Sequence, residues 1–167
     1  DKFDARDIVN ETIKRYEKAI QEKGLKLNLH LADNDIAIVS DRSKVERVFQ
    51  NVFNNSVKFT SQGEITVKVH PSADRANVEL EVIDTGTGIE ESKLDQIFEP
   101  FQQADNSTIR SFSGLGLGLT VARRMAELIG GQLAIASTPD VGTQVLMSFP
   151  AQASGAAPLV QEQRKYA

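Results

Sequence analysis

The sequence predicts an α/β domain, because helix-like and strand-like stretches follow one another along most of its 167 residues. Apolar residues recur at helical spacing in four stretches, and six other short stretches have the pattern of strands, most of them with apolar and polar residues in alternation. The chain is 40% hydrophobic and 25% charged, an ordinary composition for one domain with a core. Helices and strands of this kind bury their apolar faces by packing in layers.

Capping residues and closing residues place the expected helices. Asp4 or Asp7 suits the N-cap of the first helix, and Ser40 or Asp41 suits that of the second. The third helix is short and the fourth follows a glycine-rich stretch. The four helices are expected to end at Gly24, at about Phe59, at Phe98 before Pro100, and at Ile129 before Gly130.

Alternation of apolar and polar residues places the expected strands. Val78, Leu80 and Val82 alternate with acidic residues, which predicts a half-buried strand that leads to Asp84. The same pattern puts His30 on the polar side of its strand, facing solvent. The other expected strands span residues 25–31, 36–39, 65–70 and 145–149, with one more that starts at Leu133.

Three polar side chains gather on one face of the second expected helix. At 100° per residue, Asn51, Asn55 and Lys58 project side by side at the edge of the apolar stripe. A solvated helix face is the ordinary explanation of such a row. Asparagine is a mediocre helix former, so two asparagines one turn apart weaken that explanation modestly.

Two glycine-spaced turns lie in the second half of the chain. Asp84 ends a strand before Gly86 and Gly88, and the run from Gly114 to Leu119 leads into a helix. Glycine lets the backbone approach a ligand closely, and a helix that opens on glycine offers free N–H groups to a phosphate. Each turn could also be a plain solvent-facing turn, but the order of acid, polar loop 102–113 and phosphate turn indicates a nucleotide site.

Several classes of protein are disfavoured by composition. The net charge of −4 argues against a nucleic-acid binder, and no apolar run is long enough for a membrane helix. The two histidines cannot make a structural zinc site without cysteine. The P-loop and protein-kinase signatures are absent. Asp84-Thr85-Gly86 also matches the triplet of aspartic proteases, so a homodimeric protease is an alternative.

Four motifs resemble the catalytic, ATP-binding domain of sensor histidine kinases, a group related to gyrase, MutL and heat-shock chaperone ATPases. The motifs are an N box at 51–60, glycine boxes at 84–89 and 114–119, and an F box at 98–101. The resemblance covers residues 1–150 and leaves 151–167 as a linker or C-terminal tail. It implies a two-layer α/β sandwich with a mixed β-sheet covered on one face by helices, the Bergerat ATP-binding fold.

The resemblance assigns roles to individual residues. Asn55 would bind Mg²⁺, Asn51 would face the same site, and Lys58 would meet a phosphate. Asp84 would accept a hydrogen bond from the adenine amino group. Residues 102–113 would form the ATP lid, with Arg110 near the γ-phosphate. The remaining nucleotide contacts are expected at Gly86, Gly88, Ile89, Phe101, Gly114, Leu115, Gly116, Leu117, Gly118 and Leu119, and the catalytic residues are expected to be Asn51, Lys58 and Arg110.

The resemblance also implies a reaction and partners. The γ-phosphoryl group of ATP would pass to a histidine on a separate dimerisation region, and later to a response regulator receiver domain. This domain would lie in the cytoplasm, without contact to membrane or nucleic acid. A degenerate nucleotide-binding regulator is the alternative.

The sequence departs from the family's pattern at two places. Asn51 stands where related hydrolases carry a catalytic glutamate, which favours transfer over hydrolysis. Ser113 and Leu115 occupy places where related kinases often have glycine and threonine, which puts ATP affinity and lid movement in question. Neither His30 nor His70 resembles the acceptor histidine, so a chain that starts at Asp1 is expected to be a fragment.

Overall fold

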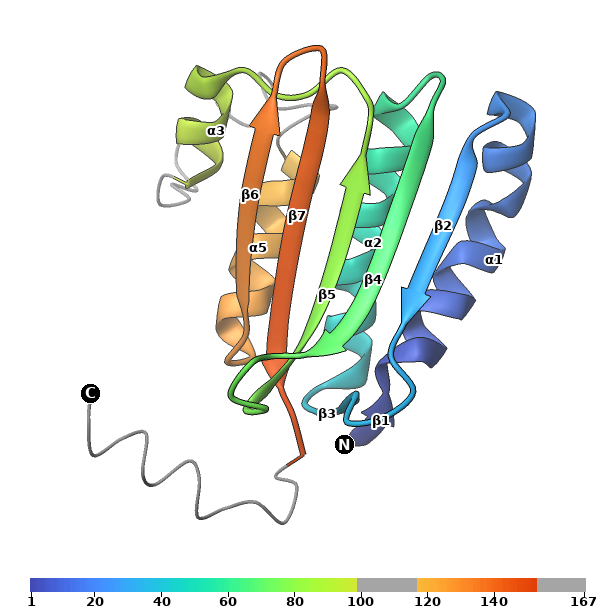
Figure 1. Ribbon diagram of the computed structural model, residues 1–167. Coiled ribbons are helices and arrows are strands. Elements are labelled where there is room, and N and C mark those ends of the chain that lie inside the picture. The colour runs from blue at the N-terminus through green and yellow to red at the C-terminus, as the bar shows by residue number, and fades with distance from the viewer. Residues whose placement is uncertain (99–116, 153–167) are drawn as a thin grey trace.

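The computed structural model describes residues 1–98 and 117–152, and these form the two-layer α/β sandwich that the sequence predicts (Figure 1). Helices α1, α2 and α5 cover one face of a sheet, and α3 lies beyond its β6 edge. The helices are α1 (Ala5–Lys23), α2 (Arg42–Phe59), α3 (Glu91–Phe98) and α5 (Leu117–Leu128). The strands are β1 (Lys2–Asp4), β2 (Lys26–Leu31), β3 (Ala37–Val39), β4 (Glu64–Pro71), β5 (Asn77–Asp84), β6 (Gln132–Thr138) and β7 (Gly142–Pro150).

The main sheet is mixed, with the strand order β2-β4-β5-β7-β6. β2 runs parallel to β4, and the other neighbours pair antiparallel. β1 and β3 form a separate antiparallel pair in which Phe3 lies opposite Ile38. The sequence did not predict β1, because a strand of three residues with one buried side chain is too short to show alternation.

The predicted caps of the first two helices are confirmed. Asp4 is the N-cap of α1 and accepts the Arg6 N–H at 2.8 Å, while Gly24 closes that helix in the left-handed conformation with φ of 64°. Asp41 caps α2 and accepts the Lys44 N–H at 3.2 Å. The fourth helix begins at Leu117, three residues earlier than expected, so Gly118 lies inside its first turn.

The core lies between the sheet and the three covering helices. Alternate residues of β4 and β5, such as Val67 and Leu80, are fully buried against the helices. Phe49 and Phe53 of α2 stack with ring centroids 5.9 Å apart, and Tyr16 of α1 meets Phe53 edge-on at 5.6 Å. The ring contact of Tyr16 joins α1 to α2, and the buried apolar stripe of α2 packs into the core, so the polar row described above lies on a helix fixed within the fold.

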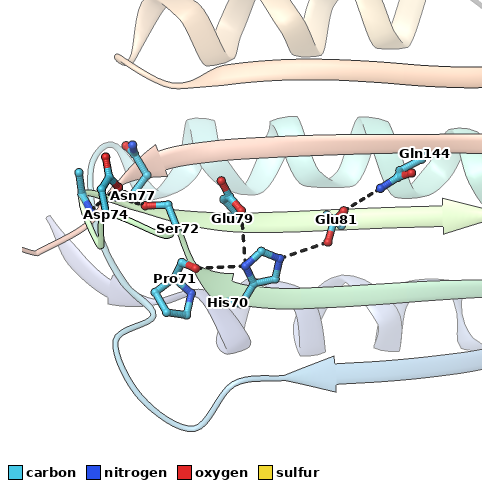
Figure 2. A network of polar contacts seen from close by, with 9 residues as sticks. His70, Pro71, Ser72, Asp74, Asn77, Glu79, Glu81 and Gln144 are labelled. Atoms are coloured by element: carbon cyan, nitrogen blue, oxygen red, sulfur yellow. Dashed lines mark hydrogen bonds and ion pairs between the residues drawn. The ribbon is translucent and has the colours of Figure 1, made fainter. Parts of the chain in front are cut away.

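The open face of the sheet carries polar side chains instead. There His70 of β4 lies between two acidic residues of β5: its Nδ1 is 3.4 Å from Glu79 and its Nε2 is 3.1 Å from Glu81 (Figure 2). Gln144 of β7 donates to the other oxygen of Glu81 at 2.8 Å. His70 therefore lies on a strand and is paired with two glutamates.

The predicted tail begins in contact with the fold. Ala151 pairs with Ile38, and the Gln152 N–H donates to the Ala37 carbonyl at 3.0 Å, so both residues remain attached to β3. The short helix expected at 159–167 and the end of the third helix at Pro100 lie outside the described residues. In the described ranges, no helix has both the length and the apolar character needed to cross a membrane.

Candidate nucleotide site

Asp84 is buried at the end of β5, on the face of the sheet that the helices cover. Its Oδ1 accepts the Gly86 N–H at 3.0 Å and the Thr143 N–H at 3.3 Å. Its Oδ2 accepts the hydroxyl of Ser56 at 2.8 Å. Three donors from three different segments thus hold one carboxylate in place.

Burial dominates the electrostatics of Asp84. It raises the pKa of the Asp84 carboxyl, and the donors from Gly86, Ser56 and Thr143 offset this effect only in part. Within the described part of the chain, no cationic side chain forms an ion pair with Asp84. The site therefore presents a hydrogen-bond acceptor stabilised by dipoles, which suits an uncharged donor on a ligand.

The glycine turn after Asp84 lies tightly against the protein's own backbone. A Cβ on Gly86 would stand 2.5 Å from the Phe59 carbonyl oxygen at the end of α2. A Cβ on Gly88, where φ is 71°, would stand 2.2 Å from the Thr138 carbonyl oxygen at the end of β6. The two glycines therefore let this turn join α2 and β6. Their expected contact with a base stays a prediction.

Ile89 is fixed by a hydroxyl network at the same turn. Its N–H donates to Ser137 Oγ at 2.8 Å. The Ser137 hydroxyl in turn donates to the Gly142 carbonyl at 3.0 Å, and its oxygen lies 2.8 Å from Thr143 Oγ1. The Ile89 side chain is buried in the core. The network ties the turn to the same β7 residue whose N–H holds Asp84.

The polar row on α2 is present as predicted. Asn51 and Asn55 are half-buried and Lys58 is exposed. Within the described part of the chain, the two carboxamides make no hydrogen bond. The Lys58 ammonium lies 5.4 Å from the centroid of the Phe59 ring.

Lys23 supports the end of this row. Its ammonium donates to the Val57 carbonyl at 2.5 Å and to the Lys58 carbonyl at 3.2 Å, so α1 caps the last turn of α2. Sequence reasoning missed Lys23, and it also missed Ser56, Ser137 and Thr143. Each of these residues contacts its partner across a long sequence separation, and none stands out in a pattern of apolar residues.

The second glycine turn is described only from Leu117 onward. Among the described residues, no atom lies within 4 Å of the position of a Cβ on Gly118, whereas the Leu119 side chain is buried in the core. The predicted contacts at Phe101, Arg110, Gly114, Leu115 and Gly116 lie outside the described residues, as do the lid 102–113 and the side chain of Leu117.

These parts meet at one end of the sheet. The C-terminal end of α2, the end of β5 and the start of α5 lie side by side there (Figure 1), and α2 packs against α5. The described residues contain no cluster of histidine or acidic side chains that could hold a metal.

Comparison with known proteins gives a family and a fold. Residues 40–153 match the family model described as "Histidine kinase-, DNA gyrase B-, and HSP90-like ATPase". The chain is 36% identical over 151 residues to the autoinducer 2 sensor kinase/phosphatase LuxQ of Vibrio cholerae. This match covers 89% of the chain but 18% of LuxQ, so the chain spans less than a fifth of that relative.

Solved structures share the fold. The nucleotide-free catalytic domain of histidine kinase ThkA superposes with a TM-score of 0.73 at 22% identity, covering 90% of this chain and 94% of that domain. ThkA in complex with the response regulator TrrA gives a TM-score of 0.71 at 20% identity, covering 91% of this chain and 42% of that one.

Proposed function

We infer the reaction from one premise: the chain belongs to the histidine kinase-, DNA gyrase B- and HSP90-like ATPase family, as the ATP-binding catalytic domain of a two-component sensor histidine kinase. We propose that it binds ATP with Mg²⁺ and transfers the γ-phosphoryl group to a histidine outside this chain. The aspartic-protease alternative is wrong, because Asp84 lies inside the region that matches the ATPase family.

One observation supports the site most directly. Ser56, which donates a hydrogen bond to Asp84, follows Asn55 on α2. Helix α2 therefore links Asp84, the proposed adenine contact, to the polar row proposed to face the phosphates. We propose that Asp84 accepts the adenine amino group, which selects ATP over GTP, because guanine carries an acceptor at that position. Asn55 and Asn51 would then face Mg²⁺ and Lys58 would face a phosphate.

In phosphoryl transfer, the domain mainly positions the reacting groups and stabilises the charge on the phosphates. The bond between the γ-phosphorus and its bridging oxygen breaks, a phosphorus–nitrogen bond forms, and the imidazole proton leaves to solvent or a base. Bound Mg²⁺ would neutralise charge on the phosphates. Lys58, Arg110 and the N–H groups that open α5 would meet the remaining charge. Asn51 has no carboxylate to activate water, so ATP should be hydrolysed slowly.

The acceptor histidine must come from another region. His30 and His70 both lie on strands, and His70 is already paired with two glutamates. We propose that residues 1–150 act on a helical dimerisation region of the parent protein, and that a receiver domain of a response regulator takes the phosphoryl group next. ThkA, which shares this fold, binds such a regulator.

Radiolabelled ATP with Mg²⁺ tests the reaction. The 167-residue chain should bind ATP without acquiring acid-labile label, and label should appear on the histidine of the parent's upstream helices when these are added. Label on the chain alone would contradict the proposal, since it would place the acceptor among residues 1–167. Absence of any ATP binding would contradict the kinase assignment altogether.

The magnesium ligand can be tested with neighbouring asparagines. Asn55→Ala should abolish most of the gain in ATP affinity that Mg²⁺ provides, because an oxygen ligand is lost. Asn54→Ala is the matched control, since Asn54 is the exposed residue beside it on α2. Calorimetry with and without Mg²⁺ measures the gain. An equal gain in both variants would refute the ligand role of Asn55.

A further inference from the structure

Ser56 is a buried hydroxyl that sequence reasoning did not place in the site. It lies on α2 with a relative exposure of 4%, and it donates its hydroxyl hydrogen to Asp84 Oδ2 at 2.8 Å. The two residues are 28 positions apart, and the contact joins a helix to the end of a strand. The only hydrogen of the Ser56 hydroxyl is thus given to the carboxylate of Asp84.

The hydrogen bonds of Asp84 leave one position for a ligand. An ionised carboxylate can accept about four hydrogen bonds. Oδ1 already accepts the N–H groups of Gly86 and Thr143, and Oδ2 accepts Ser56. The position that remains is on Oδ2, beside the Ser56 oxygen. Because Ser56 has given its only hydrogen to Asp84, both oxygens can only accept a hydrogen bond from a ligand.

Ser56 also fixes the orientation of the carboxylate. The two backbone donors hold Oδ1 alone, and the last torsion of an aspartate side chain is broad and weakly restrained. Within the described residues, Ser56 is the one donor on Oδ2. Without it, rotation about the Cβ–Cγ bond, which displaces both carboxylate oxygens, would be opposed only by the two hydrogen bonds on Oδ1.

We infer that Ser56 is a positioning residue for base recognition: it holds Asp84 so that the last acceptor position of Oδ2 meets the 6-amino group of adenine. This inference rests on the proposed function, and it adds a role for Ser56 in the choice of base. Ser56 does not touch the reacting phosphate, so it should influence which base binds, not the transfer step.

A cycle that combines a protein change with a ligand change tests the inference. The ligands are ADP and an analogue with hydrogen in place of the 6-amino group, and their dissociation constants are measured by calorimetry on the 167-residue chain. The wild type should prefer ADP by roughly tenfold or more, the value of one hydrogen bond to a charged acceptor. Ser56→Ala should reduce that preference by about threefold or more and change the binding of the analogue by less than about twofold.

Two further variants separate positioning from packing. Ser56→Thr keeps the hydroxyl and should restore most of the preference for ADP. Ser43→Ala is the matched control, since Ser43 is an exposed serine of the same helix whose hydroxyl donates to Asp41 at 2.9 Å. It should behave as the wild type does.

The outcomes distinguish this inference from the proposed function. Equal loss of affinity for both ligands in Ser56→Ala would mean that Ser56 only supports the fold, and an unchanged preference would mean that Asp84 is positioned without it. Either result overturns the inference and leaves the proposed function intact. A wild type that binds ADP and the analogue equally would overturn the inference together with the proposed role of Asp84, because the amino group would then have no partner.

Discussion

Asp84 and Glu81 lie on the same strand, β5, yet their side chains point to opposite faces of the sheet. Asp84 faces the helices and is held by a hydroxyl and two backbone N–H groups. Glu81 faces the open side and is held by His70 and Gln144 (Figure 2). The same chemical group thus has dipoles for partners on one face and an ionisable ring on the other.

The two environments shift the pKa values of the two carboxyl groups in opposite directions. Burial raises the pKa of Asp84, and its neutral donors do not fully compensate. Burial also acts to raise the pKa of Glu81, but hydrogen bonds from His70 and Gln144 outweigh it and lower the pKa below 4.5. A carboxylate whose partners satisfy it is a structural element. A buried carboxylate without a cationic partner can still accept a hydrogen bond, and a ligand can supply the donor.

Crowding at the Asp84 end should produce the largest effect on stability. Gly88→Ala should lower the free energy of unfolding by about 2–4 kcal/mol, because the new Cβ meets the Thr138 carbonyl in a left-handed backbone. Gly24→Ala is the control, with a similar φ of 64° and no atom of the described residues within 4 Å of its Cβ position, and it should cost about 1 kcal/mol. Urea unfolding measures both, and equal losses would show that the close approach is unimportant.

The next largest effect is expected at Asp84, on the face of the sheet that the helices cover, and it concerns the affinity for ADP. Asp84→Asn should weaken ADP binding by about 1–3 kcal/mol, because an amide accepts more weakly than a carboxylate and also presents donors. Glu81→Gln is the control on the same strand and should leave the affinity for ADP unchanged. Titration calorimetry gives both values. Unchanged affinity in Asp84→Asn would remove Asp84 from the site.

The network of the open face should have the smallest effect, and one that depends on pH. Burial acts to lower the pKa of His70, but the hydrogen bonds to Glu81 and the Pro71 carbonyl, with the charge of Glu79, raise it above 6.5. Its stabilising contribution is therefore complete below pH 6.5 and is lost as the pH rises through the folded-state pKa. The stabilising contribution of Glu81 is complete above pH 4.5, and it is lost as the pH falls through the lowered pKa of Glu81 in the folded state.

His70→Gln should consequently cost more stability near pH 5.5 than near pH 9, by about 0.5 kcal/mol, since the pair is partly exposed and screened by solvent. His30→Gln, an exposed histidine of β2, is the control and should show no such difference. Urea unfolding at the two pH values measures the change. A cost that does not vary with pH would mean that the ion pairs of His70 add nothing.

The local patterns of the chain were sufficient for its elements, most of its caps and the face of α2 that carries Asn51, Asn55 and Lys58. Each of these depends on residues a few positions apart, whose relation follows from the periods of a helix or a strand. The resemblance of four motifs then supplied the layered fold. The short strand β1 was not predicted, because it has too few residues for a period to appear.

The partners of Asp84 and Glu81 depended on the folded chain. Ser56, Thr143 and His70 reach these acids from other elements of the sandwich, and no spacing in the sequence relates them. Long-range contacts arise when elements pack, because sheet register and helix placement decide which side chains share a face. The sequence could therefore point to the acid of the site, whereas the groups that orient it and set its charge appear only after the layers have come together.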